Sequence, residues 1–419
     1  MKIWIFNQYG MLPEHGPMSR THQFTKHLNR RGCEATAFVA SHPHNSKFQL
    51  IEGREKFAVY KDCDFPWVLV KTCNYEDGGP LRGPRRIWSI IQYFFNLFAA
   101  AKHFEKPECI IGSSAPPFTA LAAVILARRY KCKSIVEIRD LWPESIVDYG
   151  VASKNNPIVK LLYKLEKWLY TNADAVIFTI EGGRDYIIES GWDTGHGGSV
   201  DLSKVYHINN GVDIKEFDYN RSTFILDDPD LADPDTFKVV YTGSLRKANN
   251  IGLLLDLAKK ITLPNVKFLI WGAGNDVEAL RQRIVDEGIG NVVIKGHVEK
   301  KYIPYINSRA DLNVLNYQTT GVMRYGGSQN KLFEYFASGT PVMTNIKLGY
   351  DLLERYDCGF HADYSDIDGV SRQLEALMTM PREEYEKLCA NARRAAEDYD
   401  FNVLTDKLLA VLNGLLYEN

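Results

Sequence analysis

Short apolar runs alternate with longer helical patterns through the first half of the chain, and no other feature restricts the fold as much. The runs KIWIF, EATAFVA, ECIIG, SIVEIRD and ADAVIFT have the length of strands, while residues 21–31 and 118–130 have helical patterns. Strands without a polar face are typical of a parallel sheet that helices cover on both sides. The first half is therefore predicted to form a doubly wound α/β domain.

This pattern stops at VYHINNGVDIKEF and at the polar stretch 227–235, and then begins again. The runs FKVVYTG, KFLIWGAG, VVIKGH, ADLNVLN and TPVMTN are the expected strands of a second sheet, with helices expected at 250–260 and 277–287. Two Rossmann-like domains account for the repeated pattern. The hinge between them is predicted near Asn210 and Gly211.

The predicted domains are residues 1–211 and 212–395, and the final segment 396–419 is expected to pack back on the first of them. In open parallel sheets, ligands bind beyond the carboxyl ends of the strands, where loops and helix N-termini converge. Two such sheets that face each other would form a cleft for two substrates.

Charge and cysteine usage exclude several classes of protein. The 419 residues carry a formal net charge of -2, which gives no reason to expect a nucleic-acid partner. The seven cysteines are scattered without a C-x-x-C pair, which argues against a disulfide framework or a structural zinc site and fits a reducing cytoplasm. The N-terminal MKIWIFNQYG lacks the long apolar core of a signal peptide, so the mature chain is expected to begin at Met1.

The most apolar segment, IWSIIQYFFNLFAAA at 87–101, is too short to span a bilayer and contains polar residues. An interior helix with cationic ends is the favoured interpretation. In the alternative, Arg82, Arg85 and Arg86 before the segment and Lys102 after it would seat an aromatic-rich helix on an anionic membrane surface.

The most informative motif is GGSQNKLFEYFASGTP at 326–341. Its glycines allow the backbone to approach a ligand closely, and Ser328 is expected to cap a helix. The free N–H groups of that helix, with Lys331 in its first turn, form an anion site suited to a diphosphate. Glu334, one turn later, is placed to accept hydrogen bonds from a ribose diol. The expected donor contacts are Gly327, Ser328, Asn330, Leu332 and Glu334. An ordinary capped helix with a solvated Lys–Glu pair is the alternative.

This motif resembles the nucleotide-sugar motif of retaining glycosyltransferases of family 4, which have the GT-B fold. The order of further motifs is similar over nearly the whole chain: INNGVDIKEF at the hinge, then VVYTGSLRK, IWGAG, IKGHV and ADLNVLNY. The S-Q-N-K-L-F-E-Y variant and EIRDLWPES in the first half are similar to the subgroup that acts on bacterial surface polysaccharides. The resemblance implies that the first domain is on the acceptor side and that the second binds the nucleotide-sugar.

Position by position, Glu334 matches the family's ribose-binding acid, and Arg246 matches the basic residue whose guanidinium fork contacts the diphosphate. Gly326 stands where many members have the first acid of a glutamate pair. The second basic residue usual after the arginine is absent, because residues 249–251 are Asn-Asn-Ile. Lys331 is the candidate to supply that charge. A solvated loop Arg-Lys pair is the alternative for Arg246.

Two further loops of the second half match family positions. Gly272 and Gly274 in WGAGN form a tight turn after a strand. IKGHV resembles the base-contacting loop, in which backbone groups of His297 and Val298 would pair with the base edge. A purely structural turn is the alternative for each glycine.

In the first half, the loop 7–20 after the first strand resembles the family's loop that approaches the transferred sugar and phosphate, with His15 and Gly16 as candidate residues. In EIRDLWPES, Arg139 stands where many members have a histidine beside the donor sugar, and Asp140 follows as their acid does. Charges at the end of a buried strand need a polar cleft or each other. A role in the cleft is favoured over a structural ion pair.

The resemblance implies a retaining hexosyltransferase, or a related enzyme, that moves a sugar from a nucleotide-sugar to a saccharide acceptor. UDP is favoured over GDP, and the acceptor is expected to be lipid-linked, at the cytoplasmic face of the membrane, in surface polysaccharide biosynthesis. Catalysis is expected from Arg246, Lys331, Arg139 and Asp140, with no cofactor and no metal, because a helix dipole and two cations stabilise a departing diphosphate. Asp62 and Asp64 have metal-pair spacing but are expected in a surface loop.

Three other classes of protein are the alternatives. A nicotinamide dehydrogenase is disfavoured, because no G-x-G-x-x-G follows the first strand. A nucleotide-sugar epimerase or hydrolase with the same two-domain body is the closer alternative. A non-catalytic sugar-binding or scaffold protein is the third.

Overall fold

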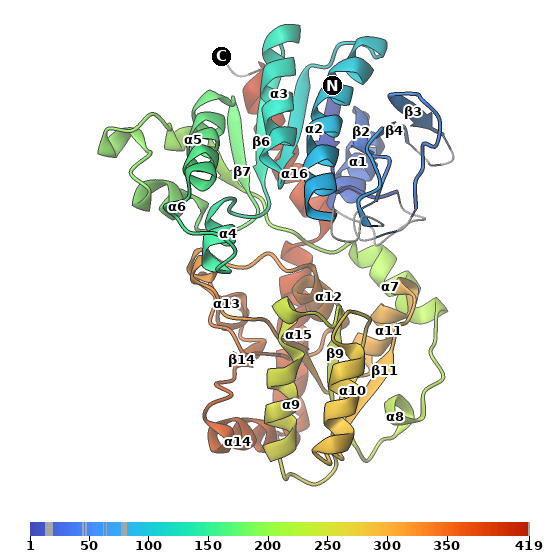
Figure 1. Cartoon of the computed structure of the whole chain (residues 1–419). Helices are drawn as coiled ribbons and strands as arrows, with labels where there is room; N and C mark the ends of the chain where they lie inside the picture. Colours follow the sequence, from blue (N-terminus) through green and yellow to red (C-terminus); the bar gives the residue numbers. More distant parts are fainter. Residues whose placement is uncertain are drawn as a thin grey trace. The chain divides into compact units, whose positions relative to one another are not determined.

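A computed structural model describes residues 1–12, 20–43, 46, 48–61, 63, 65–76 and 82–417 (Figure 1). The chain divides into two compact units. The first comprises Met1–Asn209 together with Leu404–Asn419, and the second comprises Asn210–Val403. The first domain is therefore discontinuous in sequence, since the helix α16 (Phe401–Tyr417) that ends the chain belongs to it from Leu404 on.

The first domain contains an eight-stranded sheet with the order β3-β4-β2-β1-β5-β6-β7-β8. All neighbouring strands are parallel except the edge pair β3 and β4, which is antiparallel. The strands are β1 (Lys2–Asn7), β2 (Glu34–Ala40), β3 (Phe57–Tyr60), β4 (Trp67–Val70), β5 (Cys109–Ser114), β6 (Lys133–Ile138), β7 (Ala175–Phe178) and β8 (Val205–His207). The central strands are buried on both faces, which is why their sequences lack a polar face.

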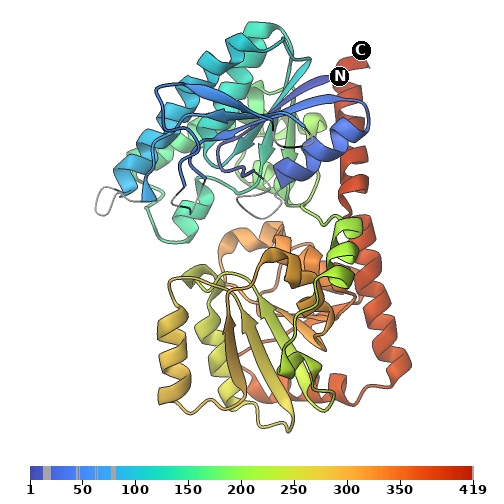
Figure 2. The same ribbon diagram turned by 90° about the vertical axis from the view of Figure 1, so that its right-hand side faces the viewer.

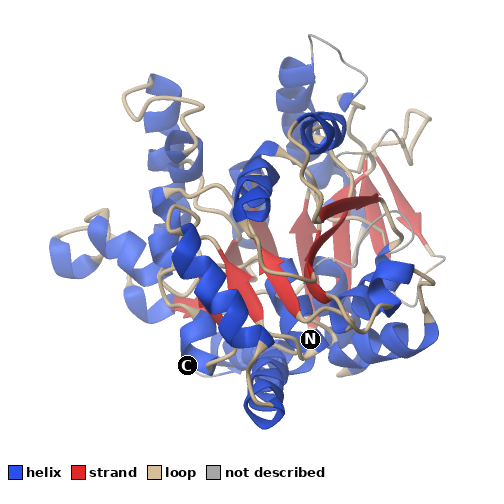
Figure 3. Cartoon of the chain, turned by 90° about the horizontal axis from the view of Figure 1, so that it is seen from below, coloured by secondary structure: helices blue, strands red, loops and turns tan. Residues whose placement is uncertain are grey.

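Helices cover both faces of this sheet, as right-handed crossovers between parallel strands require (Figure 3). The helices are α1 (Arg20–Arg30), α2 (Arg82–Ala100), α3 (Pro117–Tyr130), α4 (Glu144–Asp148), α5 (Pro157–Asn172) and α6 (Gly183–Glu189). Helices α2, α3 and α5 follow strands that step toward β8 and so share one face, while α1 steps the other way and lies with α16 on the opposite face (Figure 2).

Helix α2 differs from the expected interior helix. Its inner side, with Tyr93 and Leu97, is buried, but Ile87, Trp88 and Phe95 are more than half exposed. The interior interpretation is therefore wrong for the solvent side of this helix. No helix in the described part of the chain is long and apolar enough to cross a bilayer.

The second domain contains a six-stranded parallel sheet with the order β11-β10-β9-β12-β13-β14. Its strands are β9 (Phe237–Thr242), β10 (Val266–Trp271), β11 (Val292–Gly296), β12 (Leu312–Leu315), β13 (Val342–Thr344) and β14 (Gly359–His361). The chain runs outward from β9 to β11 and then returns to β12 on the other side of β9. The direction of the crossovers thus reverses between β9 and β12, and this reversal marks the place where ligands bind to such sheets.

The helices of this domain are α7 (Ile214–Thr223), α8 (Pro229–Ala232), α9 (Ile251–Lys260), α10 (Val277–Asp286), α11 (Ile303–Ser308), α12 (Asn330–Ser338), α13 (Leu352–Tyr356), α14 (Ile367–Met378) and α15 (Arg382–Asp398). Helices α9, α10 and α14 pack on one face of the sheet around a core that includes Leu254, Leu280 and Leu374. Helix α12 lies on the other face and packs on α11 and α15. Short 3-10 turns η6 (Lys247–Asn249), η7 (Lys300–Tyr302) and η8 (Gly321–Tyr325) occupy loops of this domain.

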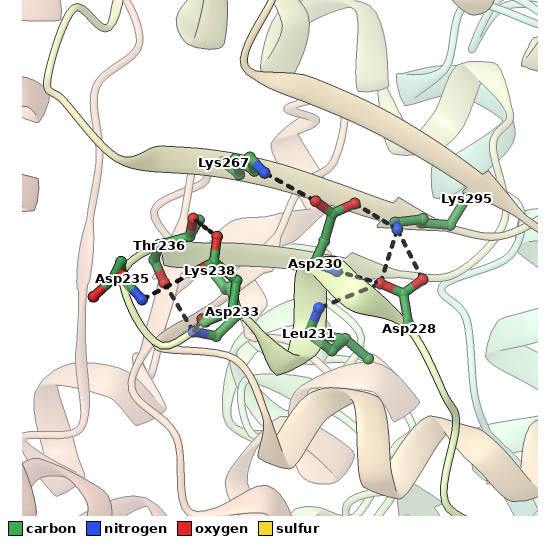
Figure 4. Close-up of polar contacts among 9 residues, drawn as sticks. All are labelled: Asp228, Asp230, Leu231, Asp233, Asp235, Thr236, Lys238, Lys267 and Lys295. Carbon is green, nitrogen blue, oxygen red and sulfur yellow. Dashed lines mark hydrogen bonds and ion pairs between the residues drawn. The ribbon is translucent and has the colours of Figure 1, made fainter.

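The polar stretch 227–235, where the sequence pattern stops, is tied to the second sheet (Figure 4). Asp228 caps α8, accepting the N–H of Asp230 at 3.0 Å, and also contacts the Lys295 ammonium of β11 at 2.8 Å. Asp230 bonds Lys295 at 2.6 Å and Lys267 of β10 at 2.9 Å. Leu231, the next residue after Asp230, is buried in an apolar cluster with Trp271, so this segment covers part of the sheet like a strap.

Candidate donor-binding site

The site lies where the crossovers of the second sheet reverse. Tyr241 is on β9, the loop 243–249 follows that strand, Tyr317 follows β12, and Lys331 is the second residue of α12. Loops after neighbouring parallel strands converge at one edge of the sheet, so these residues meet there.

Lys331 lies in an aromatic cage. Its Nζ donates to the Tyr241 hydroxyl at 2.9 Å and to Asn249 Oδ1 at 3.0 Å. The same ammonium lies 4.5 Å from the centre of the Tyr241 ring and 4.6 Å from that of Tyr317. Among the described residues, no carboxylate forms an ion pair with Lys331. The cage therefore orients the cation without neutralising it.

Burial in this cage makes the Lys331 ammonium easier to deprotonate. Removal from water lowers the pKa of Lys331 to about 7, and the carboxylate of Glu334 opposes this shift only in part. An anion placed against Lys331 would favour its charged form and raise that pKa again. The site thus gains electrostatically from an anionic ligand.

The N-terminus of α12 is open. Its N-cap residue is Gln329, which makes no side-chain cap bond, and the first helical residue, Asn330, is exposed. The expectation that Ser328 caps this helix is wrong: its hydroxyl has no hydrogen-bond partner among the described residues, and its carbonyl accepts from Asn210 at 2.7 Å. First-turn N–H groups without a side-chain cap add to the anion site that Lys331 begins.

Helix α12 is anchored in its domain by buried apolar side chains. Leu332, Phe333 and Phe336 are buried. Gly326, just before the helix, has φ of +109°, a conformation that favours glycine. A Cβ on Gly327 would come within 2.6 Å of the Leu348 side chain, so close packing also explains that glycine. Leu332 therefore faces the protein interior.

The loop after β9 supplies a second cation. Arg246 is exposed at the start of η6 and forms no ion pair with any described residue. Asn249, which stands where the family resemblance lacks its second basic residue, is buried: its Nδ2 donates to Ser244 Oγ at 2.7 Å while its Oδ1 accepts from Lys331. Asn249 thus holds the ammonium of Lys331, the candidate for the missing charge. Tyr241 and Tyr317 also hold this ammonium, and the sequence carried no signal for either.

The Glu334 carboxylate already has a partner in the protein, which the sequence did not indicate. It is 16% exposed and forms an ion pair and hydrogen bond with Lys300 of η7. The carboxylate lies one turn beyond Lys331 yet bonds a different cation, so the two residues are not a solvated pair with each other. A ribose that bonds Glu334 must share that carboxylate with Lys300.

Gly272 and Gly274 are explained by packing. A Cβ on Gly272 would lie 1.7 Å from the Gly243 carbonyl oxygen, and one on Gly274 would lie 1.9 Å from that of Leu245. The loops after β9 and β10 also exchange backbone bonds, Leu245 N–H to Ala273 O at 2.9 Å among them. These contacts fix the loop that carries Arg246. The next loop begins with His297, which is exposed, and Val298, which is half-buried against the strap cluster.

At the strand ends of the first domain, the buried charge is a different pair from the expected one. Arg20 Nε donates to Glu137 Oε1 at 2.6 Å, and both side chains are less than a tenth exposed. Arg20 also donates to the Asn209 carbonyl, and Ser113 donates to Glu137 at 2.7 Å. Arg20 lowers the pKa of Glu137 against the opposing effect of burial, which is the larger single influence.

Beside this pair, Arg139 is half-buried and Asp140 is exposed, both just beyond the end of β6. No ion pair joins them to each other or to another charge in the described ranges. Four residues singled out from the sequence lie outside the described residues: His15, Gly16, Asp62 and Asp64.

The two parallel-sheet domains and the comparisons with known proteins show a glycosyltransferase of the GT-B fold. The family model described as glycosyl transferase 4-like domain matches residues 15–196. The family model described as glycosyl transferases group 1 matches residues 225–395. A search of curated proteins gave no significant match.

Solved structures with the same fold cover the whole chain. Sucrose-phosphate synthase (tll1590) from Thermosynechococcus elongatus aligns over 100% of both chains with 16% identity and a TM-score of 0.72. Alr3699/HepE from Anabaena, in complex with UDP, aligns over 99% of this chain and 100% of its own with 14% identity and a TM-score of 0.66. An alpha,alpha-trehalose-phosphate synthase (UDP-forming) from Burkholderia vietnamiensis aligns over 99% of both with 12% identity and a TM-score of 0.67.

Proposed function

We propose that this glycosyltransferase moves a sugar from a UDP-sugar to a lipid-linked saccharide, with retention and without a metal, in surface polysaccharide biosynthesis. The observation that carries the proposal is the Lys331 ammonium, held at the open N-terminus of α12 without a carboxylate partner. Related folds support the choice of nucleotide: Anabaena HepE was solved with UDP and with UDP-glucose, and an E. coli protein with UDP-2-fluoro glucose.

The chemistry follows from the charges. When the sugar–phosphate bond breaks, negative charge grows on the diphosphate, and Lys331, Arg246 and the α12 N-terminus stabilise that charge. The acceptor hydroxyl attacks from the face that the diphosphate leaves and passes its proton to the departing phosphate oxygen, so the configuration at the sugar is retained. In this proposal Arg139 and Asp140 contact the sugar or the acceptor, together with the loop of His15 and Gly16.

The rest of the donor is assigned in the same way. Glu334 accepts from the ribose diol, and backbone groups at His297 and Val298 contact the base. Gly272 and Gly274 act by holding the Arg246 loop in place. An epimerase or hydrolase on the same body is not favoured, because both family matches are to glycosyltransferases.

Thermal shift measurements test the donor site. Excess UDP at about 100 times its dissociation constant should stabilise the protein by about 2.7 kcal/mol, in the presence of a chelator. ADP has the same charge and a different base, so it serves as the matched ligand control. A shift that requires magnesium or manganese would contradict the metal-free part of the proposal.

Transfer is tested with isotope-labelled UDP-sugars and a membrane extract. Label should move into the lipid fraction, and less so with Lys331→Ala. Label released as free sugar would indicate a hydrolase, and label recovered in an altered UDP-sugar would indicate an epimerase.

A further inference from the structure

Three helices of the first domain form one layer, in which α3 contacts both α2 and α5 (Figure 1). A helix that packs on a sheet normally turns polar residues to the solvent. Here the solvent side carries large apolar side chains, with exposed fractions of 62% for Ile87, 55% for Trp88, 64% for Phe95, 36% for Ile125, 69% for Ile158 and 66% for Leu161. We call the outward side of these three helices the α2–α3–α5 surface.

The exposed apolar residues lie in stripes along the helices and are not isolated from one another. On α2, Trp88 and Phe95 are seven positions apart, so both lie on the same side of the helix. On α5, Ile158 and Leu161 are three positions apart and are neighbours on one side. An exposed apolar area that extends over neighbouring helices marks a contact surface.

The charges of this layer have one sign. Apart from Arg82, the three helices carry seven cations: Arg85, Arg86, Arg128, Arg129, Lys160, Lys164 and Lys167. Their single acid, Glu166, is buried and accepts from the Tyr170 and Tyr186 hydroxyls at 2.6 and 2.9 Å. None of these seven cations forms an ion pair with a carboxylate in the described ranges.

Helices α9 and α10 of the second domain show the ordinary arrangement. Lys259 pairs with Glu287 at 3.1 Å, and Arg283 pairs with Glu287 at 2.6 Å and with Asp256. Their exposed charges are of both signs. The unpaired cations of the α2–α3–α5 surface are therefore a property of that surface rather than of the whole protein.

We propose that the α2–α3–α5 surface lies on an anionic lipid bilayer, with Trp88, Phe95 and Leu161 at the level of the headgroups and the surrounding cations on lipid phosphates. Aromatic and aliphatic side chains ringed by Lys and Arg fit that interface. A second copy fits it poorly, because a two-fold contact would bring the same cations face to face. The surface gives the proposed transferase its membrane contact, although vesicle binding needs neither donor nor acceptor, so either proposal can fail alone.

The test is co-sedimentation of the full chain with vesicles of phosphatidylcholine, alone or mixed with phosphatidylglycerol. Binding should require phosphatidylglycerol and weaken with salt. The triple variant Arg85→Ser/Lys160→Ser/Lys164→Ser should bind roughly a hundredfold more weakly, since each cation near an anionic surface contributes about fivefold. The double variants Trp88→Ser/Phe95→Ser and Ile158→Ser/Leu161→Ser should each bind at least tenfold more weakly, about what loss of one buried side chain produces.

Matched controls come from the second domain. Lys260→Ser/Arg372→Ser/Lys387→Ser removes three exposed cations, and Ile225→Ser/Val285→Ser removes two exposed apolar residues; both should bind as the parent does. Every variant should keep the parent's melting temperature. Equal binding to neutral vesicles, or unchanged binding of the α5 variant, would overturn the proposal. So would a parent dimer that Trp88→Ser/Phe95→Ser converts to a monomer, because the surface would then join two copies.

Discussion

Each domain holds a cation near the carboxyl ends of its strands, but only one of the two cations has a carboxylate as its partner. Arg20 of the first domain is buried against the Glu137 carboxylate, whereas Lys331 of the second has two tyrosines and Asn249. The Glu137 carboxylate balances the charge of Arg20, so little positive potential remains to attract an anionic ligand. Position at the strand ends therefore does not by itself make an anion site; a cation there must also lack an acid.

The largest effect is expected from breaking the satisfied pair. Glu137→Gln leaves the buried Arg20 guanidinium without its counter-charge and should lower the free energy of unfolding by about 3–5 kcal/mol. Urea denaturation measures this. The double variant Arg20→Met/Glu137→Gln removes the stranded charge and should recover part of the loss. A Glu137→Gln protein as stable as the parent would show that the pair is not structural.

Lys331→Ala should act in the opposite sense. It removes a cation that no carboxylate balances, so stability should be unchanged or higher. Turnover and donor affinity should fall together, by about 2–3 kcal/mol in kcat/KM, because the charge interacts most strongly with the departing diphosphate. Steady-state kinetics and a melting curve of the same sample separate the two effects.

An exchange of the two side chains provides the control. Lys331→Asn alone leaves the cage without a cation, and Asn249→Lys alone crowds two ammonium groups together. The double variant Asn249→Lys/Lys331→Asn restores one cation and one amide, and should regain at least half of the lost free energy. If the double variant were no better than Lys331→Asn, the charge would have to stand at position 331 itself.

A smaller effect is expected from pH. Because the pKa of Lys331 is about 7 in the free protein and bound diphosphate raises it, binding takes up a proton above pH 7. Affinity for UDP should therefore be full below pH 7 and fall as pH rises to 9, by at most about tenfold per unit, which calorimetry in buffers of different ionisation enthalpy can measure. Lys331→Arg stays charged over this range and should show a flat profile.

The smallest effect is expected at Glu334. Glu334→Gln keeps the shape but weakens the acceptor for a ribose diol, so affinity for UDP should fall by about 0.5–1.5 kcal/mol while that for the 2′,3′-dideoxy analogue is nearly unchanged. Lys300→Ala removes the competing partner and should strengthen UDP binding slightly. Equal losses for both nucleotides with Glu334→Gln would remove this residue from ribose recognition.

The two sheets could be predicted from sequence because apolar runs of strand length, such as KIWIF and FKVVYTG, alternate with helical patterns. Lys331 could be placed at a helix N-terminus for the same reason. Its partners could not, since Tyr241 is on β9 and Tyr317 is in the loop after β12, and the two meet only after the sheet has formed. Sequence pattern reports local periodicity and carries no information on such pairings.

Two errors have physical causes as well. Ser328 has the right chemistry for a cap, but the helix begins one residue later than that role requires, and the serine carbonyl is used by Asn210 instead. The apolar α2 was expected inside because apolar side chains usually are. Periodicity shows that a helix has apolar sides, and only the fold shows that one of them faces the solvent.

The helix α16 has a consequence for the order in which the protein is made. Leu404, Leu408 and Leu412 are buried, and Arg31 holds Asp406 at 2.9 Å, so the first domain is incomplete without the last residues of the chain. Domains usually finish folding in order as they leave the ribosome. Here the ribosome releases the closing helix of the first domain only after the entire second domain has been synthesised, and a fragment that stops at Asn209 should expose the apolar groove that α16 fills.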